Sequence, residues 1–325
     1  MISSKRLGVV ATAAMLFVAA CSGSGSTPTP AAPGGSPAAP AGSGLTCVSG
    51  SITVAGSTAL QPLVDSAGKA YTGKCSGASI NVNGGGSGTG LTQVLQGAVQ
   101  IGDSDIFAEE KLVPSDASQL VDHQVIRQGW VMVTNASVTG VTKLTTQQAT
   151  DIWTGKTTNW RDVGGPDQPI VLIIRPASSG TRATFKRIVL GGANEASGQA
   201  LTEDSNGAVA TAVQNTPGST SVIGFAYYAA NKAGITPLQL DGVDATVDNM
   251  TNGTYKLQAL GHMYTKGQPS GLAAAFLDYM MSAAVQTGLA PTQFYAPIGS
   301  APMATPPLVV TSLPPATPAP SASGH

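Results

Sequence analysis

Short apolar runs alternate with stretches of helical periodicity through the middle of the chain. The runs ITVAGS (52–57) and SINVNG (79–84) are typical of buried strands, and helical patterns follow them over 60–70 and 89–96. A strand that leads into a helix and then into another strand is the unit of a parallel sheet. The first part of the chain therefore predicts parallel βαβ structure.

The same alternation continues towards the C-terminus. After a long apolar run at 124–135, helical and strand-like patterns come in turn, and together they predict an α/β fold. We expect a helix from Thr145, a strand from Ile170, a helix over 180–190, a strand over 222–228 and a helix over 271–283.

The N-terminal residues have the pattern of a secretory signal. Two basic residues precede an apolar run over 7–20, which is shorter than the roughly 20 residues that a helix needs to span a bilayer. Two alanines stand directly before Cys21, as in a bacterial lipoprotein cleavage site. We predict that residues 1–20 form a signal peptide and that Cys21 carries a lipid such as palmitate. The alternative is an ordinary signal peptide followed by an unrelated cysteine.

Both ends of the chain are rich in Gly, Pro, Ser and Ala. Residues 21–45 contain almost no large apolar side chain, and residues 304–325 form a Pro-rich tail. Such segments cannot bury a core, so we expect a disordered linker and a disordered tail. The folded part of the chain is then about 46–303.

The composition narrows the function. The chain has 325 residues and a formal net charge of −1. A length near 300 residues favours two domains, and near-zero charge argues against nucleic acid as a partner. The three histidines are scattered singly, so we expect neither a metal site nor a histidine-dependent triad. Binding must depend on a local site rather than on the charge of the whole molecule.

Cys47 and Cys75 each stand just before a predicted strand. If these strands are parallel neighbours, their starts lie together, which suits a disulfide in an oxidising compartment. Closing a loop of this length would contribute ~3 kcal/mol in the chain-entropy model. Two free buried thiols are the alternative.

Three predicted strand-to-helix junctions share small residues and hydroxyls. They are GSTAL (56–60), GGGSGTG (84–90) and RPASSGTR (175–182). Helix N-termini offer free N–H donors and a partial positive charge, and glycine lets the backbone approach an anion. Each junction alone also fits an ordinary cap or turn. Together they predict an anion site at the carboxyl ends of the strands.

Two enzyme motifs do not fit these junctions. No lysine follows GSGTG, which disfavours a nucleotide P-loop, and Thr89 stands where a nucleophile elbow requires glycine. Asp103 and Asp105 of IGDSD are then either caps of the next segment or part of the anion site. The tryptophans are expected to pack in the core rather than to bind a ligand: Trp130, Trp153 and Trp160.

Taken in order, the motifs resemble those of a known family. GSTALQP, GGGSGTGLTQVLQGAVQIGDSD, DIWTGKTTNW and RPASSGTRATF are similar to segments of the phosphate-binding proteins of bacterial high-affinity phosphate ABC importers. The resemblance covers most of residues 50–300 and implies a two-lobed periplasmic-binding-protein fold, with a hinge and a ligand cleft between the lobes. The first lobe would take 46–133 and 228–303, and the second lobe 134–227.

The resemblance also implies a set of phosphate ligands in the three junctions and on two charged residues: Ser57, Thr58, Ala59, Ser87, Asp105, Arg175, Ser179, Gly180 and Thr181. Ala59 and Gly180 would donate through their backbone N–H groups. Two positions depart from the family pattern. Asp103 stands where a small residue is common, and Ala59 replaces a bulkier one. Neither change removes an expected donor.

The function implied is that of a lipoprotein, not an enzyme, that captures inorganic phosphate for an ABC permease. Closure of the two lobes would sequester the anion. We expect a monomer without a cofactor or metal, held at the outer face of the cell membrane by the lipid on Cys21.

A carboxylate in an anion site needs a physical reason. At neutral pH phosphate keeps at least one P–OH group, whose proton an ionised Asp105 can accept, while Arg175 binds oxygens in a bidentate manner. Fully ionised sulfate has no proton to offer and would face the carboxylate with a lone pair. A site that requires such a donor can reject an analogue lacking it by ~10⁴–10⁵.

Three other functions remain as alternatives. The chain could bind sulfate, molybdate or tungstate, but these anions lack a proton for Asp105, so its carboxylate would repel them. A phosphohydrolase would need a metal cluster or a nucleophile–base pair, for which the sequence offers no spacing. A surface phosphate sensor fits the sequence as well as a transport protein does.

Overall fold

The structure is a computed structural model that describes residues 45–196 and 200–299. Outside these ranges lie the predicted signal peptide (1–20), Cys21, the predicted tail (304–325) and all of the linker (21–45) except Leu45.

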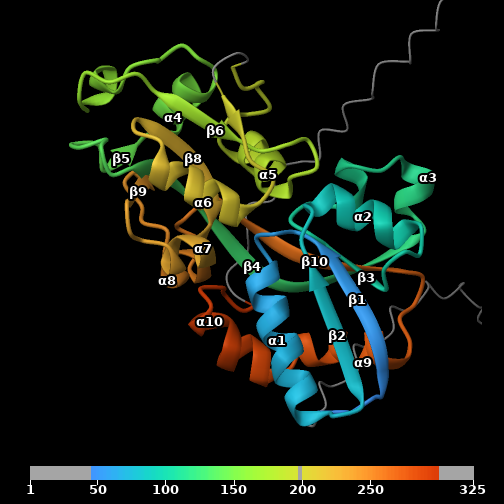
Figure 1. The fold of residues 1–325 in the computed structure, drawn as a ribbon. Helices are drawn as coiled ribbons and strands as arrows, with labels where there is room; N and C mark the ends of the chain where they lie inside the picture. The colour runs from blue at the N-terminus through green and yellow to red at the C-terminus, as the bar shows by residue number, and fades with distance from the viewer. Residues whose placement is uncertain (1–44, 197–199, 300–325) are drawn as a thin grey trace, which may run out of the picture. The chain divides into compact units, whose positions relative to one another are not determined.

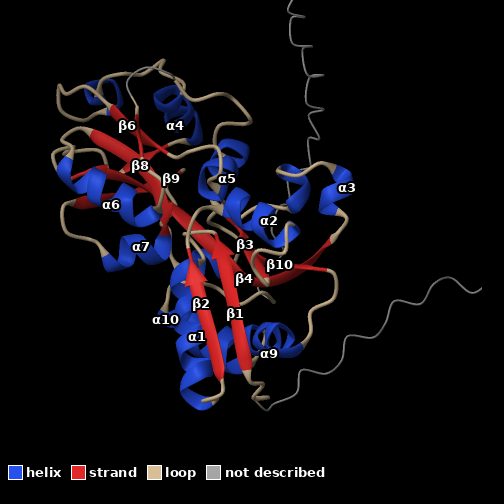
Figure 2. Cartoon of the chain, turned by 45° about the vertical axis from the view of Figure 1, so that its right-hand side comes forward, coloured by secondary structure: helices blue, strands red, loops and turns tan. Residues whose placement is uncertain are grey.

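A parallel sheet opens the fold. Strand β1 (Gly50–Gly56) pairs in parallel with β2 (Ala78–Asn83) on one side and with β3 (Ile101–Ser104) on the other. Helices α1 (Gln61–Lys74) and α2 (Ser87–Leu95) connect these strands, and Figure 2 shows β1 and β2 running side by side in the same direction. The predicted parallel βαβ structure is confirmed.

The packing of α2 on the sheet depends on glycine. A Cβ atom on Gly90 would lie 2.5 Å from the carbonyl oxygen of Ala55, and one on Gly102 would lie 2.6 Å from the carbonyl oxygen of Gly90. No larger residue fits at such distances without moving the backbone. The close approach brings the N-terminus of α2 to the ends of β1 and β3.

A long strand joins the two halves of the sheet. Strand β4 (Leu120–Asn135) pairs antiparallel with β10 (Gln258–Lys266) along its first part and with β8 (Ser219–Gly224) and β9 (Ile235–Leu240) along its last part. The strand order is β2-β1-β3-β10-β4-β8-β6-β7, in which β6 is Val171–Ile174 and β7 is Leu201–Thr202. Figure 1 shows β4 passing from one group of strands to the other. The expectation of parallel units is therefore wrong at β4, because an apolar run predicts a buried strand but not its direction.

The second half of the sheet carries its own helices. Strand β6 (Val171–Ile174) pairs in parallel with β8 and with β7 (Leu201–Thr202), and β5 (Lys143–Leu144) pairs with β9. The helices of this half are α4 (Thr146–Trp153), α5 (Gly180–Ile188), α6 (Asn206–Asn215), α7 (Phe225–Ala230) and α8 (Val247–Thr251).

One predicted strand is wrong in its second part. The expected strand over 222–228 ends at Gly224, where α7 begins. Asn206 binds this end of the strand, because its Oδ1 accepts a hydrogen bond at 2.7 Å from the N–H of Gly224, the last residue of the pairing between β4 and β8. The aromatic residues of α7 are half-buried, so the strand-like composition did not reflect a sheet position.

Two main cores lie on either side of the junction at β4. One packs α1, β1 and α9 (Gly271–Met280) around Tyr71 and Phe276. The other contains all three tryptophans, which confirms their predicted place in the core. Leu238, Met250 and Leu257 also belong to this second core. The predicted lobe boundary at 228 stays a prediction, but this packing favours assigning 235–257 to the second lobe.

The starts of β1 and β2 are joined covalently. Gly50 pairs with Ala78 in the parallel register, and Cys47 and Cys75 form a disulfide with their Cα atoms 5.2 Å apart. The predicted disulfide is confirmed.

The remaining helical segments are short: η1 (Ala108–Glu110), α3 (Pro114–Ala117), η2 (Trp160–Val163), η3 (Ala284–Leu289) and α10 (Ala290–Thr292). None of the helices within the described ranges has the length and apolar character needed to cross a bilayer.

Candidate functional site

The three predicted anion-binding junctions converge on one buried place. They follow the ends of β1, β2 and β6 and form the approach to α1, the N-terminus of α2 and the N-terminus of α5. The loop before α2 touches the loop before α5, because the Gly88 N–H donates to the carbonyl oxygen of Ser178 at 2.9 Å. Residues from both halves of the sheet therefore surround a single site.

Asp105 lies at the centre of this arrangement and is 2 % exposed. Its Oδ1 accepts hydrogen bonds from the hydroxyl of Ser57 and from Nε2 of Gln128, the latter at 2.9 Å. Its Oδ2 accepts from the hydroxyl of Thr181 at 3.4 Å, and its backbone N–H donates to Oγ of Ser87 at 2.9 Å. The carboxylate is thus fixed by donors from both halves.

Two opposing effects set the protonation of Asp105. Burial raises the pKa of its carboxyl, while the hydrogen bonds from Ser57 and Gln128, the charge of Arg175 and the bond from Thr181 lower it. Burial gives the net direction, so the pKa lies above its ordinary value. The two donors that converge on Oδ1 nevertheless match the acceptor character of an ionised carboxylate.

Arg175 follows β6 and is 4 % exposed. Its Nε donates to the carbonyl oxygen of Glu203 at 3.0 Å, and its Nη2 donates to the carbonyl oxygen of Asp204 at 2.8 Å and to Oγ1 of Thr58 at 3.4 Å. Nη1 is buried and has no hydrogen-bond partner among the described residues. Burial lowers the pKa of the guanidinium, and the carboxylate of Asp105 acts in the opposite direction.

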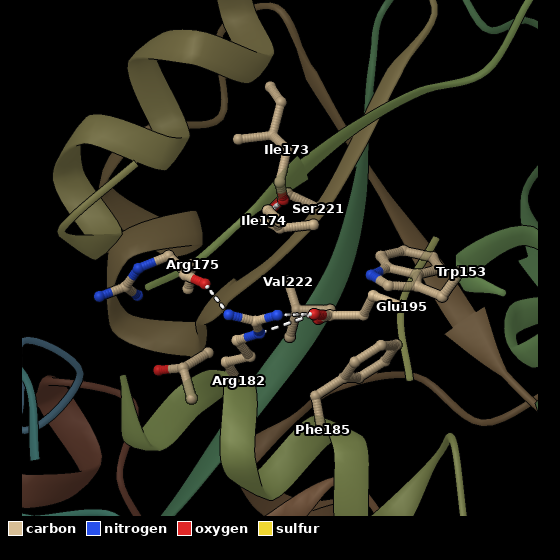
Figure 3. A pocket seen from close by; sticks show the side chains of 10 residues that line it. Trp153, Ile173, Ile174, Arg175, Arg182, Phe185, Glu195, Ser221 and Val222 are labelled. Atoms are coloured by element: carbon tan, nitrogen blue, oxygen red, sulfur yellow. Dashed lines mark hydrogen bonds and ion pairs between the residues drawn. The ribbon is translucent and has the colours of Figure 1, made fainter. Parts of the chain in front are cut away.

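A second arginine holds this loop in place. Arg182 donates through Nη1 to the carbonyl oxygen of Arg175 at 2.8 Å and through Nε to Glu195 at 2.6 Å. Figure 3 shows Arg182 between these two partners, with the side chain of Arg175 pointing away from it. Arg182 thus binds the backbone of Arg175 and not its guanidinium, which faces the site.

The N-terminus of α5 approaches the same carboxylate. A Cβ atom on Gly180 would lie 2.1 Å from Oγ of Ser87 and 2.7 Å from Cβ of Asp105, so only glycine fits there. Ser179 caps the helix by accepting from the Arg182 N–H at 3.2 Å. The first backbone N–H groups of a helix have no partner within it, which leaves those of Gly180 and Thr181 as donors.

The predicted site residues are therefore brought together. Contacts or close approaches connect the junctions through Asp105, Arg175 and their neighbours: Ser57, Thr58, Ser87, Gly180 and Thr181. The Ala59 N–H donates to Oγ of Ser57 at 3.1 Å, so it serves its own loop in this structure. The side chain of Ser179 likewise serves its own helix.

Three polar residues of the site were not predicted. Gln128 binds Asp105, the indole N–H of Trp130 donates to Oγ1 of Thr181 at 3.0 Å, and Nδ2 of Asn206 donates to Oγ1 of Thr58 at 2.9 Å. A glutamine inside the apolar run of β4 is a signal for Gln128, because a buried polar side chain needs a partner. Asn206 directly follows the helix cap Ser205, a position that gives no hint of a contact with Thr58.

The arrangement suits a small oxyanion that carries a proton. Backbone and hydroxyl donors, together with the unpaired Nη1 of Arg175, can bind anionic oxygens, and the carboxylate of Asp105 can accept a hydrogen bond from an O–H group. Within the described ranges, no three acidic, histidine or cysteine side chains gather in a way that could hold a metal ion.

Comparisons with known proteins agree with this reading. Residues 41–284 match the PBP superfamily domain. The chain is 45% identical to the phosphate-binding protein PstS of Bacillus subtilis (strain 168) over 250 residues, which cover 77% of this chain and 81% of the relative.

Two solved structures are similar as well. One is a putative phosphate ABC transporter substrate-binding protein with bound phosphate from Clostridium perfringens, with 27% identity, a TM-score of 0.69 and coverage of 77% of this chain and 100% of that one. The other is an ABC-type phosphate transport receptor from Vibrio cholerae, with 26% identity, a TM-score of 0.60 and coverage of 75% and 99%. Both confirm the α/β binding-protein fold.

Proposed function

The chain belongs to the PstS family of phosphate-binding proteins, within the PBP superfamily, and we propose that it captures inorganic phosphate for an ABC importer. The observation that carries the proposal is the pair of buried charges in one site. Arg175 has a buried Nη1 without a partner among the described residues, and the carboxylate of Asp105 lies close enough to act on its pKa. An uncompensated buried guanidinium N–H is costly, so an anion at this place would stabilise the protein.

We propose that the ligands come from both halves of the molecule. The hydroxyls of Thr58, Ser87 and Thr181 and the N–H groups at the starts of α2 and α5 would donate to phosphate oxygens. The other proposed members of the set are Ser57, Ala59, Ser179 and Gly180. Because donors on the two sides would meet the same ion, binding would favour a closed arrangement of the two halves.

The affinity needed for capture is within reach of such a site. Hydrogen bonds to charged groups contribute about 1.5–3 kcal/mol each, and five or six would give a gross ~8–18 kcal/mol. Micromolar binding needs only about −8 kcal/mol net. Part of the difference is consumed by ordering the ligand and closing the site.

The test is titration calorimetry of the purified protein with phosphate and with sulfate. We expect phosphate to bind with micromolar or tighter affinity and sulfate to show no measurable binding, because only phosphate offers a proton to Asp105. Equal affinities for the two anions would contradict the proposal.

The proposal does not include turnover. The relatives are transport binding proteins, and capture for import needs only binding and release. Phosphatase activity that is lost on replacing Ser87 or Ser179 would contradict this part of the proposal.

We also propose that the protein is a monomer anchored to the outer face of the cell membrane by a lipid on Cys21. The support is the sequence alone: a short apolar run, two alanines before the cysteine and a Pro-rich linker after it. Growth with a labelled palmitate should label the wild-type protein and not Cys21→Ser. Equal labelling of both would refute the anchor.

A further inference from the structure

We propose that Asp103 limits the negative charge of the phosphate site, staying protonated beside Asp105 while the anion is bound and weakening binding when it ionises. This inference rests on the proposed phosphate function and assigns a role in the pH dependence of binding to a residue outside the proposed ligand set. Asp103 would make retention of phosphate dependent on pH.

The position of Asp103 supports a neutral side chain. It lies in β3 and is 1 % exposed, and it is close enough to Asp105, two residues further along the chain, for the charge of Asp105 to act on it. Its Oδ1 is buried and has no hydrogen-bond partner among the described residues. A carboxylate with a buried, unpartnered oxygen is far more costly to bury than a neutral carboxylic acid.

Among the described residues, the only charge that acts on the pKa of Asp103 is the negative charge of Asp105. The strand partners of Asp103 are Gly56 on β1 and Met263 on β10. Burial raises the pKa of the phenol of Tyr295, from the segment after α10, and Tyr227, Asp105 and Asp103 lie close enough to raise it further. The hydroxyl of Tyr295 donates its proton to the carbonyl oxygen of Ala59 at 2.6 Å and not to Asp103.

The carboxyls of Asp103 and Asp105 therefore differ in the groups that act on their protonation. Burial, and then the charge of Asp105, raise the pKa of Asp103 well above its usual value, with no opposing cause among the described residues. Asp105 has donors and the charge of Arg175 to favour ionisation. Two acids so close together share a single negative charge, and that charge belongs on Asp105.

The net charge of the site explains why ionisation of Asp103 would weaken anion binding. With Asp103 neutral, the charges of Asp105 and Arg175 cancel and an anion enters a site without net charge. With Asp103 ionised, the site carries a net negative charge that opposes any anion. Bound phosphate would in turn hold the proton on Asp103 more tightly, so phosphate binding and protonation of Asp103 are linked.

The experiment compares wild-type protein with Asp103→Asn, in which an amide of the same shape cannot ionise. Phosphate affinity is measured by calorimetry from pH 5 to pH 10. We expect the wild-type protein to lose affinity, relative to the variant, as the pH rises through the pKa of Asp103, by up to about tenfold per pH unit for one linked proton. Parallel pH profiles would overturn the inference.

Stability gives a second measurement with a defined sign. Because burial and the charge of Asp105 raise the folded-state pKa of Asp103, its ionisation lowers the stability of the protein only above the unfolded pKa. The loss grows as the pH rises from the unfolded value and is complete above the folded value. Asp103→Asn should therefore raise the melting temperature of the phosphate-free protein more at pH 8 than at pH 4. The matched control is Asp122→Asn, which removes the partner of His262 outside the site.

Three outcomes separate this inference from the proposed function. If neither protein binds phosphate at any pH, the proposed function fails. If both bind it with the same pH dependence, only the role of Asp103 fails. If the variant does not fold, wild-type protein is titrated with phosphate in buffers of different ionisation enthalpy at steps from pH 5 to pH 10. Binding must take up protons in part of this range, and no uptake at any of these pH values would overturn the inference.

Discussion

The loop that follows β3 and the loop that follows β6 each bring one charged side chain into the same site, and the protein satisfies the two charges to different degrees. Asp105 accepts hydrogen bonds on both oxygens, from Ser57, Gln128 and Thr181. Arg175 also makes three hydrogen bonds, but its Nη1 is left without a partner among the described residues.

From this difference we infer that Asp105 and Arg175 have separate roles in anion binding. The carboxylate of Asp105 is already oriented by the protein, so it can accept a hydrogen bond from a protonated anion without rearranging. The guanidinium keeps one buried donor for the ligand, so it contributes affinity rather than discrimination. A residue of the first kind should affect which anion binds, and a residue of the second kind should affect how tightly any anion binds.

Replacing Arg175 should have the largest effect. Arg175→Ala removes the charge that offsets Asp105 and leaves the buried carboxylate uncompensated, at a cost of about 2–5 kcal/mol. Phosphate affinity measured by calorimetry should fall by about 30-fold to several thousand-fold. Arg161→Ala is the control, because Arg161 is exposed and pairs with Asp162 and Asp167 on the surface. If Arg175→Ala bound phosphate with wild-type affinity, the role in affinity inferred for Arg175 would be wrong.

Replacing Asp105 should change selectivity more than affinity. Asp105→Asn keeps the shape and an acceptor oxygen but removes the charge that opposes sulfate. The ratio of phosphate to sulfate affinity should fall by about 100-fold or more from the ~10⁴–10⁵ that a required donor can provide. Competition calorimetry with both anions measures it. If selectivity is unchanged while affinity collapses, the two residues share one role and the inference of separate roles is wrong.

The smallest effect on phosphate binding should come from breaking an ion pair that connects the two halves of the molecule. Arg187 of α5 pairs with Glu110 of η1 at 2.5 Å, and both side chains are partly buried. Glu110→Gln keeps a hydrogen-bond acceptor for the Phe107 N–H but removes the charge. Such a pair is worth about 0.2–1 kcal/mol, so phosphate should dissociate up to roughly fivefold faster in stopped-flow measurements.

The control for the edge pair is Lys186→Gln on the same helix, because Lys186 contacts Asn194 within its own half. This variant should release phosphate at the wild-type rate. A faster release from Lys186→Gln than from Glu110→Gln would show that general surface charge matters more than the pair between the halves.

Much of the local structure could be predicted from the sequence. The strands and helices around the first two junctions, the disulfide between Cys47 and Cys75 and the core position of the tryptophans are all confirmed. These features depend on short-range patterns: a run of apolar residues, helical periodicity after it, and a cysteine before each of two neighbouring strands. The resemblance of the junctions to a known family added the set of proposed ligands.

The errors have a common origin. The direction of β4 and the end of β8 at Gly224 depend on partners far away in the sequence. Gln128 and Asn206 were missed for the same reason, since each bonds to a residue far away in the sequence, Asp105 and Thr58 respectively. A side chain's role in such a network is decided by what packs next to it, and no local pattern records that.

The sequence by itself determined where donors and acids occur along the chain, because helix caps, glycines and charged residues act within a few positions of themselves. Only the tertiary structure decided how the two acids of IGDSD differ. Asp105 received three donors from distant strands and helices, whereas Oδ1 of Asp103 received none among the described residues. The free energy of a buried charge depends on its nearest partners in space, and folding alone brings those partners together.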